Sequence, residues 1–202
     1  MSFDYIALAT ASAALGGVLW GVYQYGKAQV TQRQAVLFEH IKELNQSKDL
    51  ILAKQILGYG HVKKPKYGWK HKGDPNYYSD HLGEILRNKE RVDDDGELEI
   101  KDSIDSFIVF LGKVGYSLKV GAIKRHEIIY FQYWIHKTIK NKMVQDYINQ
   151  PDNEFPLYQM LLKELTKSGI LHKWGKSYKL ELEWKTRATE SQRQLLIDDR
   201  PS

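Results

Sequence analysis

Cysteine is absent from this 202-residue chain, which excludes disulfide bonds and thiolate chemistry and leaves His, Asp and Glu as possible metal ligands. The chain also lacks a GxSxG motif, a P-loop, a dinucleotide-binding fingerprint and an HExxH pair. Three of its seven histidines, His61, His71 and His81, share one segment, but their spacing matches no known metal site. We therefore predict no catalytic residues, no metal, no cofactor and no enzymatic activity.

The first segment has almost no charge, because all 30 basic residues lie beyond Gly26 and Asp4 is the one acidic residue before it. Residues 5–26 would form a helix of roughly 33 Å, enough to cross a hydrocarbon core of about 30 Å. A buried helix of a soluble protein is one alternative. A cleaved signal peptide is another, although it would need a positively charged start. The pattern favours a transmembrane anchor over residues 1–26.

Basic residues set the expected direction of this anchor, since Lys27, Arg33 and Lys42 follow the uncharged stretch and none precedes it. The positive-inside rule then predicts a single-pass protein with its N-terminus outside and its C-terminal domain in the cytosol. Small residues recur every four positions, which predicts a strip for packing against another transmembrane helix, of a second copy or of a different membrane protein: Ala9, Ala13, Gly17 and Gly21.

A juxtamembrane helix is expected over 27–60, where Val30, Leu37, Leu44 and Ile51 recur at heptad spacing and Gly58-Tyr59-Gly60 ends it. A stalk packed on its own domain is favoured slightly over a coiled coil. A basic loop and connecting segment follow over 61–102. Its loop is either solvated or contacts membrane lipid headgroups, nucleic acid or an acidic protein through Lys63, Lys64, Lys66, Tyr67, Trp69, Lys70 and Lys72.

The remainder is expected to be a helical domain over 103–185 and a polar tail over 186–202. Apolar spacing predicts a helix over 104–120, capped by Asp102 or Ser103 and stopped at Gly121, and another over 157–167. A single helix is expected over 124–149, with inward positions Ile128, Phe131, Ile135, Ile139 and Met143. Alternation at 178–184 predicts a strand that pairs with 169–174 as a β-hairpin. The fold class is therefore mainly α: an anchor, a stalk and a small helical bundle with a C-terminal hairpin.

Two resemblances follow from these residues. The order of anchor, stalk and the segment IDSFIVFLGKVGYSLKVGAIKRHEIIYFQYWIHKTI (104–139) resembles uncharacterised bacterial single-pass membrane proteins, which implies an N-terminal anchor before a cytosolic helical bundle. The segment PLYQMLLKELTKSGILHKWGKSYKLELEW (156–184) resembles the last helix and wing of a winged-helix domain. That resemblance implies nucleic-acid contacts from Gln159, Lys163, Lys167, Lys173, Lys176 and Lys179.

The function expected from the sequence is a membrane-anchored interaction module, an accessory subunit that holds a partner at the cytosolic face of a membrane. The alternative is a membrane-tethered nucleic-acid-binding protein. It is not favoured, because acidic residues such as Glu164, Glu181 and Glu183 dilute the positive charge that phosphate contacts need.

Overall fold

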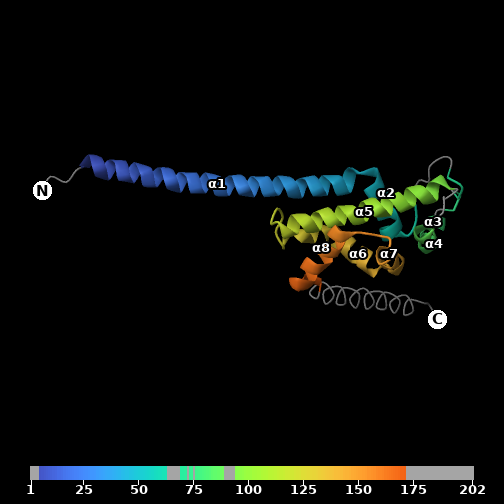
Figure 1. The fold of residues 1–202 in the computed structure, drawn as a ribbon. Coiled ribbons are helices and arrows are strands. Elements are labelled where there is room, and N and C mark those ends of the chain that lie inside the picture. The colour runs from blue at the N-terminus through green and yellow to red at the C-terminus, as the bar shows by residue number, and fades with distance from the viewer. Residues whose placement is uncertain (1–4, 63–68, 72, 75, 89–93, 172–202) are drawn as a thin grey trace, which may run out of the picture.

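The computed structural model describes residues 5–62, 69–71, 73, 74, 76–88 and 94–171, with side chains from residue 14 onward. Helices dominate these residues and no strand occurs among them, so the mainly α fold class is confirmed. Figure 1 shows one long helix lying along a body of shorter helices.

The long helix is α1, Tyr5–Gln46, and it is followed by α2, Lys48–Lys54, and the π-helical turn η1, Gln55–Tyr59. Residue Ser47 separates α1 from α2 with extended backbone, so the helix expected over 27–60 is interrupted there. Gly60 ends the segment with a φ of 70°, a left-handed conformation that favours glycine. The predicted stop at Gly58-Tyr59-Gly60 is confirmed.

Two short helices, α3 (Tyr77–Asp80) and α4 (Leu82–Arg87), precede the central helix α5, Asp95–Lys119. The prediction that α5 starts at Asp102 or Ser103 was wrong. Asp94 is its N-cap, and the Asp94 carboxylate accepts a hydrogen bond from the backbone N–H of Gly96 at 2.9 Å. Asp95 and Glu97 therefore lie in the first turn of the helix, where negative charge is favourable.

The apolar face of α5 matches the sequence prediction, since Ile104, Phe107, Ile108, Leu111 and Val114 are all buried. Gly121, with a φ of 76°, follows the end of this helix as expected. The last described helix, α8, Pro156–Lys167, lies directly against α5 and buries Tyr158, Leu161 and Leu165. Together α5 and α8 form the centre of the core.

The single helix expected over 124–149 is instead three segments: the 3₁₀ turn η2 (Glu127–Phe131), α6 (Gln132–Lys140) and α7 (Lys142–Ile148). Asn141 divides α6 from α7 because its side chain accepts a hydrogen bond from the N–H of Val144 at 3.1 Å and caps the new helix. Met143, predicted to point inward, is 40% exposed.

The β-hairpin predicted at the C-terminus is not supported by the described residues. Ile170 and Leu171, placed in its first strand, are helical. The remainder of the hairpin and the tail, residues 172–202, lie outside the described residues.

The membrane anchor predicted over residues 1–26 was wrong. In the part of the chain that the structure describes, no helix combines the length with the apolarity that a membrane crossing requires. The α1 helix has the length, but Thr10, Ser12 and Gln24 and many alanines and glycines lower the hydropathy of its uncharged stretch. The single-pass location with an outside N-terminus is therefore withdrawn.

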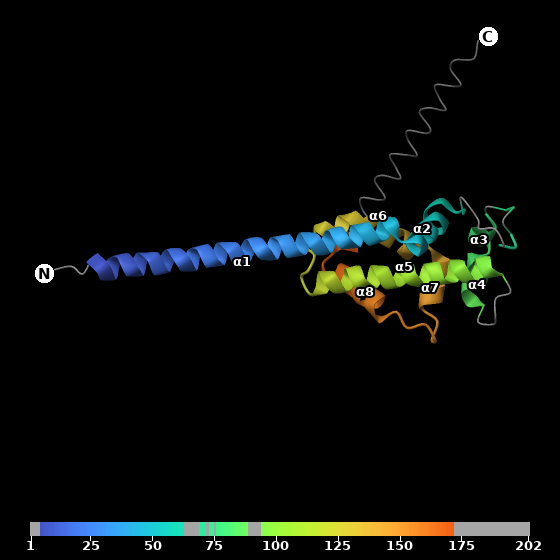
Figure 2. The same ribbon diagram turned by 90° about the horizontal axis from the view of Figure 1, so that it is seen from above.

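Among the described side chains of α1, those in its C-terminal part pack on the body. Leu44 is buried there, and Val36, Leu37 and Ile41 pack against the core. His40 Nε2 lies 2.9 Å from Ser117 Oγ of α5, and burial lowers the pKa of this histidine below its ordinary value. In both views the N-terminal part of α1 extends beyond every other labelled helix (Figures 1 and 2).

Candidate interaction site

The extended part of α1 is a long helical surface on which none of the other described residues packs. Every residue from 14 to 32 is exposed, and we call this segment the free half of α1. Large apolar side chains on it expose 41–69% of their surface: Leu15, Val18, Leu19, Trp20, Val22, Tyr23, Tyr25 and Val30. Such a concentration of exposed apolar surface is typical of an interaction site.

These side chains are not evenly distributed around the helix. At about 100° per residue they occupy an arc of roughly 220°, which we call the apolar arc. The opposite side, the small arc, carries the exposed residues Gly17, Gly21, Gln24 and Ala28. The free half therefore has one broad apolar side and one narrow side of small or polar residues.

The apolar arc continues the side of α1 that packs on the body. Leu37 and Leu44 lie at heptad spacing after Tyr23 and Val30, so all four point in nearly the same direction from the helix axis. Leu44 is 4% exposed, whereas Val30 is 41% and Tyr23 is 59% exposed. The same helix face is thus covered by the body at one end and left uncovered at the other.

Glycines support this interpretation. In the body, a Cβ atom added at Gly112 or Gly115 of α5 would lie 2.7 or 2.5 Å from a leucine Cβ of α8, so glycine there permits close helix packing. In the free half, added Cβ atoms would meet nothing within 4 Å at Gly16, Gly17, Gly21 and Gly26. A helix-interior glycine costs roughly 1 kcal/mol relative to alanine. No packing within the described residues offsets that cost in the free half.

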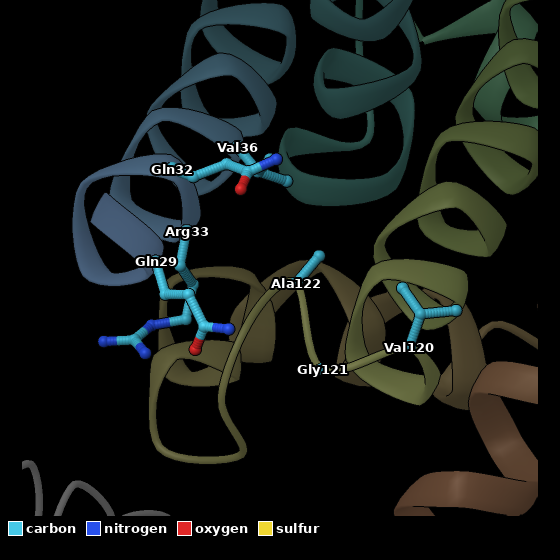
Figure 3. Close-up of a pocket in the computed structure, with 7 residues that line it drawn as sticks. All are labelled: Gln29, Gln32, Arg33, Val36, Val120, Gly121 and Ala122. Atoms are coloured by element: carbon cyan, nitrogen blue, oxygen red, sulfur yellow. The ribbon is translucent and has the colours of Figure 1, made fainter. Parts of the chain in front are cut away.

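A cleft lies where the free half meets the body, and we call it the notch (Figure 3). It has a volume of about 360 Å³ and lies between α1 and the loop after α5, with lining residues Gln29, Gln32, Arg33, Val36, Val120, Gly121 and Ala122. Val120 is itself 55% exposed. The apolar arc therefore ends against a second surface contributed by the end of the body.

Arg33 fixes this corner of the structure. Its Nε atom lies 3.4 Å from Oε1 of Glu127, and the two side chains are 19% and 11% exposed. The other oxygen, Glu127 Oε2, accepts a hydrogen bond from the backbone N–H of Lys124 at 2.6 Å. The ion pair thus joins α1 to η2 and to the loop that forms the floor of the notch.

A second group of side chains lies at the opposite end of the body, where His71, Asp94 and Glu97 place their ligand atoms within 4.8 Å of one another. Hydrogen bonds already engage both carboxylates. Asp94 accepts from the N–H groups of Lys70 and Gly96 and from the hydroxyl of Tyr78, and Glu97 accepts from the hydroxyl of Tyr77. We interpret this group as the network that fixes the start of α5.

Most of the basic loop predicted to contact polyanions is not described by the structure. The loop residues outside the described ranges are Lys63, Lys64, Lys66, Tyr67 and Lys72. Lys70 is exposed, but Trp69 is 4% exposed and packs edge-on against Tyr78 with a centroid distance of 4.8 Å. The Trp69 ring therefore belongs to the core and does not take part in a surface contact.

Some of the residues expected to contact nucleic acid are described by the structure, and others are not. Gln159, Lys163 and Lys167 are exposed on one face of α8. The proposed wing residues Lys173, Lys176 and Lys179 lie outside the described residues. Of the four-residue repeat, Gly17 and Gly21 lie on the exposed small arc, while the side chains of Ala9 and Ala13 are not described.

Comparison with protein-family models, curated proteins and solved structures found no match to this chain. The free half of α1 and the notch therefore have to be interpreted from their own geometry. Sequence reasoning missed the notch, because it depends on Arg33 and the loop after Gly121 meeting in three dimensions. The predicted heptad of Val30, Leu37, Leu44 and Ile51 could have indicated the uncovered face if it had been extended back to Tyr23.

Proposed function

We propose that this protein is an interaction module, an accessory subunit that holds a partner protein on the free half of α1. The observation that carries the proposal is the uncovered apolar arc, on which Leu15, Leu19 and Tyr25 are each at least 66% exposed. Burying such side chains contributes about 25 cal/mol per Å², so a helix that covers the arc gains substantial free energy. The body fixes the other half of α1 and presents the arc at a defined angle.

The partner surface that fits the arc is an apolar helix. Residues 5–26 contain no charged side chain, so they offer no ion pair to a charged partner. An amphipathic or apolar helix packs along such a surface through interdigitated side chains. Gly17 and Gly21 allow close approach from the small arc as well.

Photo-crosslinking in cells tests this proposal. A photoreactive phenylalanine derivative is placed at Leu19 in the arc or, as a control, at Tyr116, a body residue of α5 that is 52% exposed. We expect discrete covalent protein adducts from position 19 and none of comparable yield from position 116. Equal yields from the two positions, or no protein adduct from position 19, would refute the proposal.

A second candidate function, nucleic-acid binding, is favoured by the single exposed face of α8 that carries Gln159, Lys163 and Lys167. Phosphate contacts release counterions, so the affinity for DNA or RNA must fall steeply as salt rises. The affinity of the full chain is measured at increasing salt concentration, and the logarithm of the affinity is plotted against the logarithm of the salt concentration. The slope of this plot should become shallower by roughly one unit for each lysine replaced by alanine. An affinity that does not depend on salt would remove this candidate.

A further inference from the structure

The geometry points to a second copy of this chain as the partner, bound antiparallel so that the apolar arcs of two α1 helices pack on one another. This inference rests on the proposed function, because it names the partner of the same surface. It assigns the pairing, its direction and its register.

The absence of charged residues from 5–26 favours pairing with a second copy. The stretch 5–26 has no charged residue, so pairing it with itself removes no charge from water and places no like charges together. A two-fold interface uses the same surface on both subunits and therefore has to be self-complementary. Residues 14–26 of the free half meet this requirement, and Lys27 is the first charged residue after them.

The position of the body beside α1 decides the relative direction of the two paired helices. The body lies on the same side of α1 as the apolar arc, since Leu37 and Leu44 continue that arc into the core. If two helices packed arc to arc in parallel, the two bodies would occupy the same space beside the pair. The N-terminal part of α1 extends beyond the other helices (Figures 1 and 2). An antiparallel arrangement therefore places the bodies at opposite ends of the pair, with the N-terminal end of each α1 directed toward the notch of the other copy.

The length of α1 between its start and the notch sets the size of the interface. Between the start of α1 at Tyr5 and the notch at Arg33 the helix is about 44 Å long, or about four heptads, which is sufficient for a coiled-coil pairing. Roughly four residues in seven lie at such a seam, giving about 16 from each copy. Stable interfaces use roughly 20–30 residues from each partner. The notch residues Val120, Gly121 and Ala122 raise this number to about 19, close to the lower end of that range.

The register follows from the length of the uncovered helix. If Tyr5 at the start of one α1 lies opposite Arg33 at the notch of the second copy, the two-fold axis passes at Leu19, midway between them. Leu15 of one copy then lies opposite Tyr23 of the second copy. Each of these contacts occurs twice, once on either side of the axis.

Because the chain has no cysteine, introduced thiols report the pairing directly. Purified full-length Leu15→Cys and Tyr23→Cys proteins are oxidised separately and as a mixture. We expect at least about ten times more disulfide-linked dimer in the mixture than in either protein alone, because only 15–23 pairs meet in the antiparallel register. The matched control Gln24→Cys, on the small arc, should cross-link with neither. Linkage of each variant to itself, without 15–23 linkage, would overturn the proposed direction.

Light scattering and sedimentation measure the association itself. Wild type should have about twice the mass of one chain at micromolar concentration. Leu19→Lys should weaken the dimer at least about 100-fold, because it places two like charges at the two-fold axis. Gln24→Lys, which adds the same charge to the opposite side of the same helix, should leave the dimer intact. A monomeric wild type, or equal effects of the two lysines, would overturn the second-copy inference.

The in-cell crosslinks separate the two proposals. Adducts from position 19 to the same chain support both of them. Adducts only to a different protein leave the interaction function standing and overturn the second copy as partner. The absence of protein adducts overturns both.

Discussion

Gly115 offers the sharpest test of how the body is held together. A Cβ atom at this position would lie 2.5 Å from the Cβ and 2.8 Å from the Cα of Leu161, a fully buried residue of α8. Carbon atoms pack at about 3.5–4.0 Å, so Gly115→Ala has to push the α8 backbone away by about 1 Å. Overpacking costs about 1–3 kcal/mol, and the contact with the Leu161 backbone places Gly115→Ala near the upper end, at about 2–3 kcal/mol. The better helix propensity of alanine offsets about 1 kcal/mol of this cost. We expect a net loss of about 1–2 kcal/mol in the free energy of unfolding.

Urea denaturation followed by circular dichroism measures this loss as a lower transition midpoint. Gly21→Ala is the matched control, because it makes the same change in a helix where no atom lies within 4 Å of the added Cβ. It should leave the body transition unchanged and increase the helicity of the free half. A Gly115→Ala protein as stable as wild type would refute the close α5–α8 contact.

Three further changes are expected to have measurable effects. Because burial lowers the pKa of His40, the unfolded chain binds its proton more tightly. The contribution of neutral His40 to the free energy of unfolding should be fully present above about pH 6.5 and be lost as the pH falls through the folded-state pKa. The urea midpoint of His40→Gln should therefore fall less over this pH range than the midpoint of wild type. Tyr147→Phe removes the 2.8 Å hydrogen bond that the tyrosine hydroxyl donates to Asp105 and should cost about 1.5–3 kcal/mol in urea denaturation, whereas an unchanged midpoint would refute that bond. Asp94→Ala removes the N-cap of α5 and should cost about 0.5–2 kcal/mol; a melting temperature equal to that of wild type would contradict the capping role.

The helices of the body could be predicted where apolar spacing was strong and a glycine ended it. The α5 face from Ile104 to Val114 and the stops at Gly60 and Gly121 were read correctly for this reason. The division of 124–149 was not predicted, because Asn141 interrupts an apolar pattern that otherwise continues. The start of α5 was placed too late, because acidic residues such as those before residue 102 are common both in loop turns and in the first turn of a helix.

The N-terminal segment was misread for a different reason. Absence of charge was taken as the sign of a membrane span, but alanine, glycine and hydroxyl side chains are uncharged without being strongly apolar. Of the heptad positions expected in a stalk that packs on its own domain, Leu37 and Leu44 pack on the body, whereas Val30 is 41% exposed. What the sequence could not reveal is where that packing stops, because this depends on the end of α5 and the loop after Gly121.

The uncovered glycines connect the stability of α1 to its proposed role. The anchored half, held by Leu44 and by the ion pair of Lys113 with Glu43 at 2.9 Å, supplies the first helical turns, so the free half requires only propagation. Propagation through four glycines still costs roughly 4 kcal/mol relative to alanine. Since no described contact within the chain offsets this cost, the order of the free half depends on what covers the apolar arc. Association and helix formation are then a single equilibrium, and a substitution that weakens pairing must also loosen the helix beyond the notch.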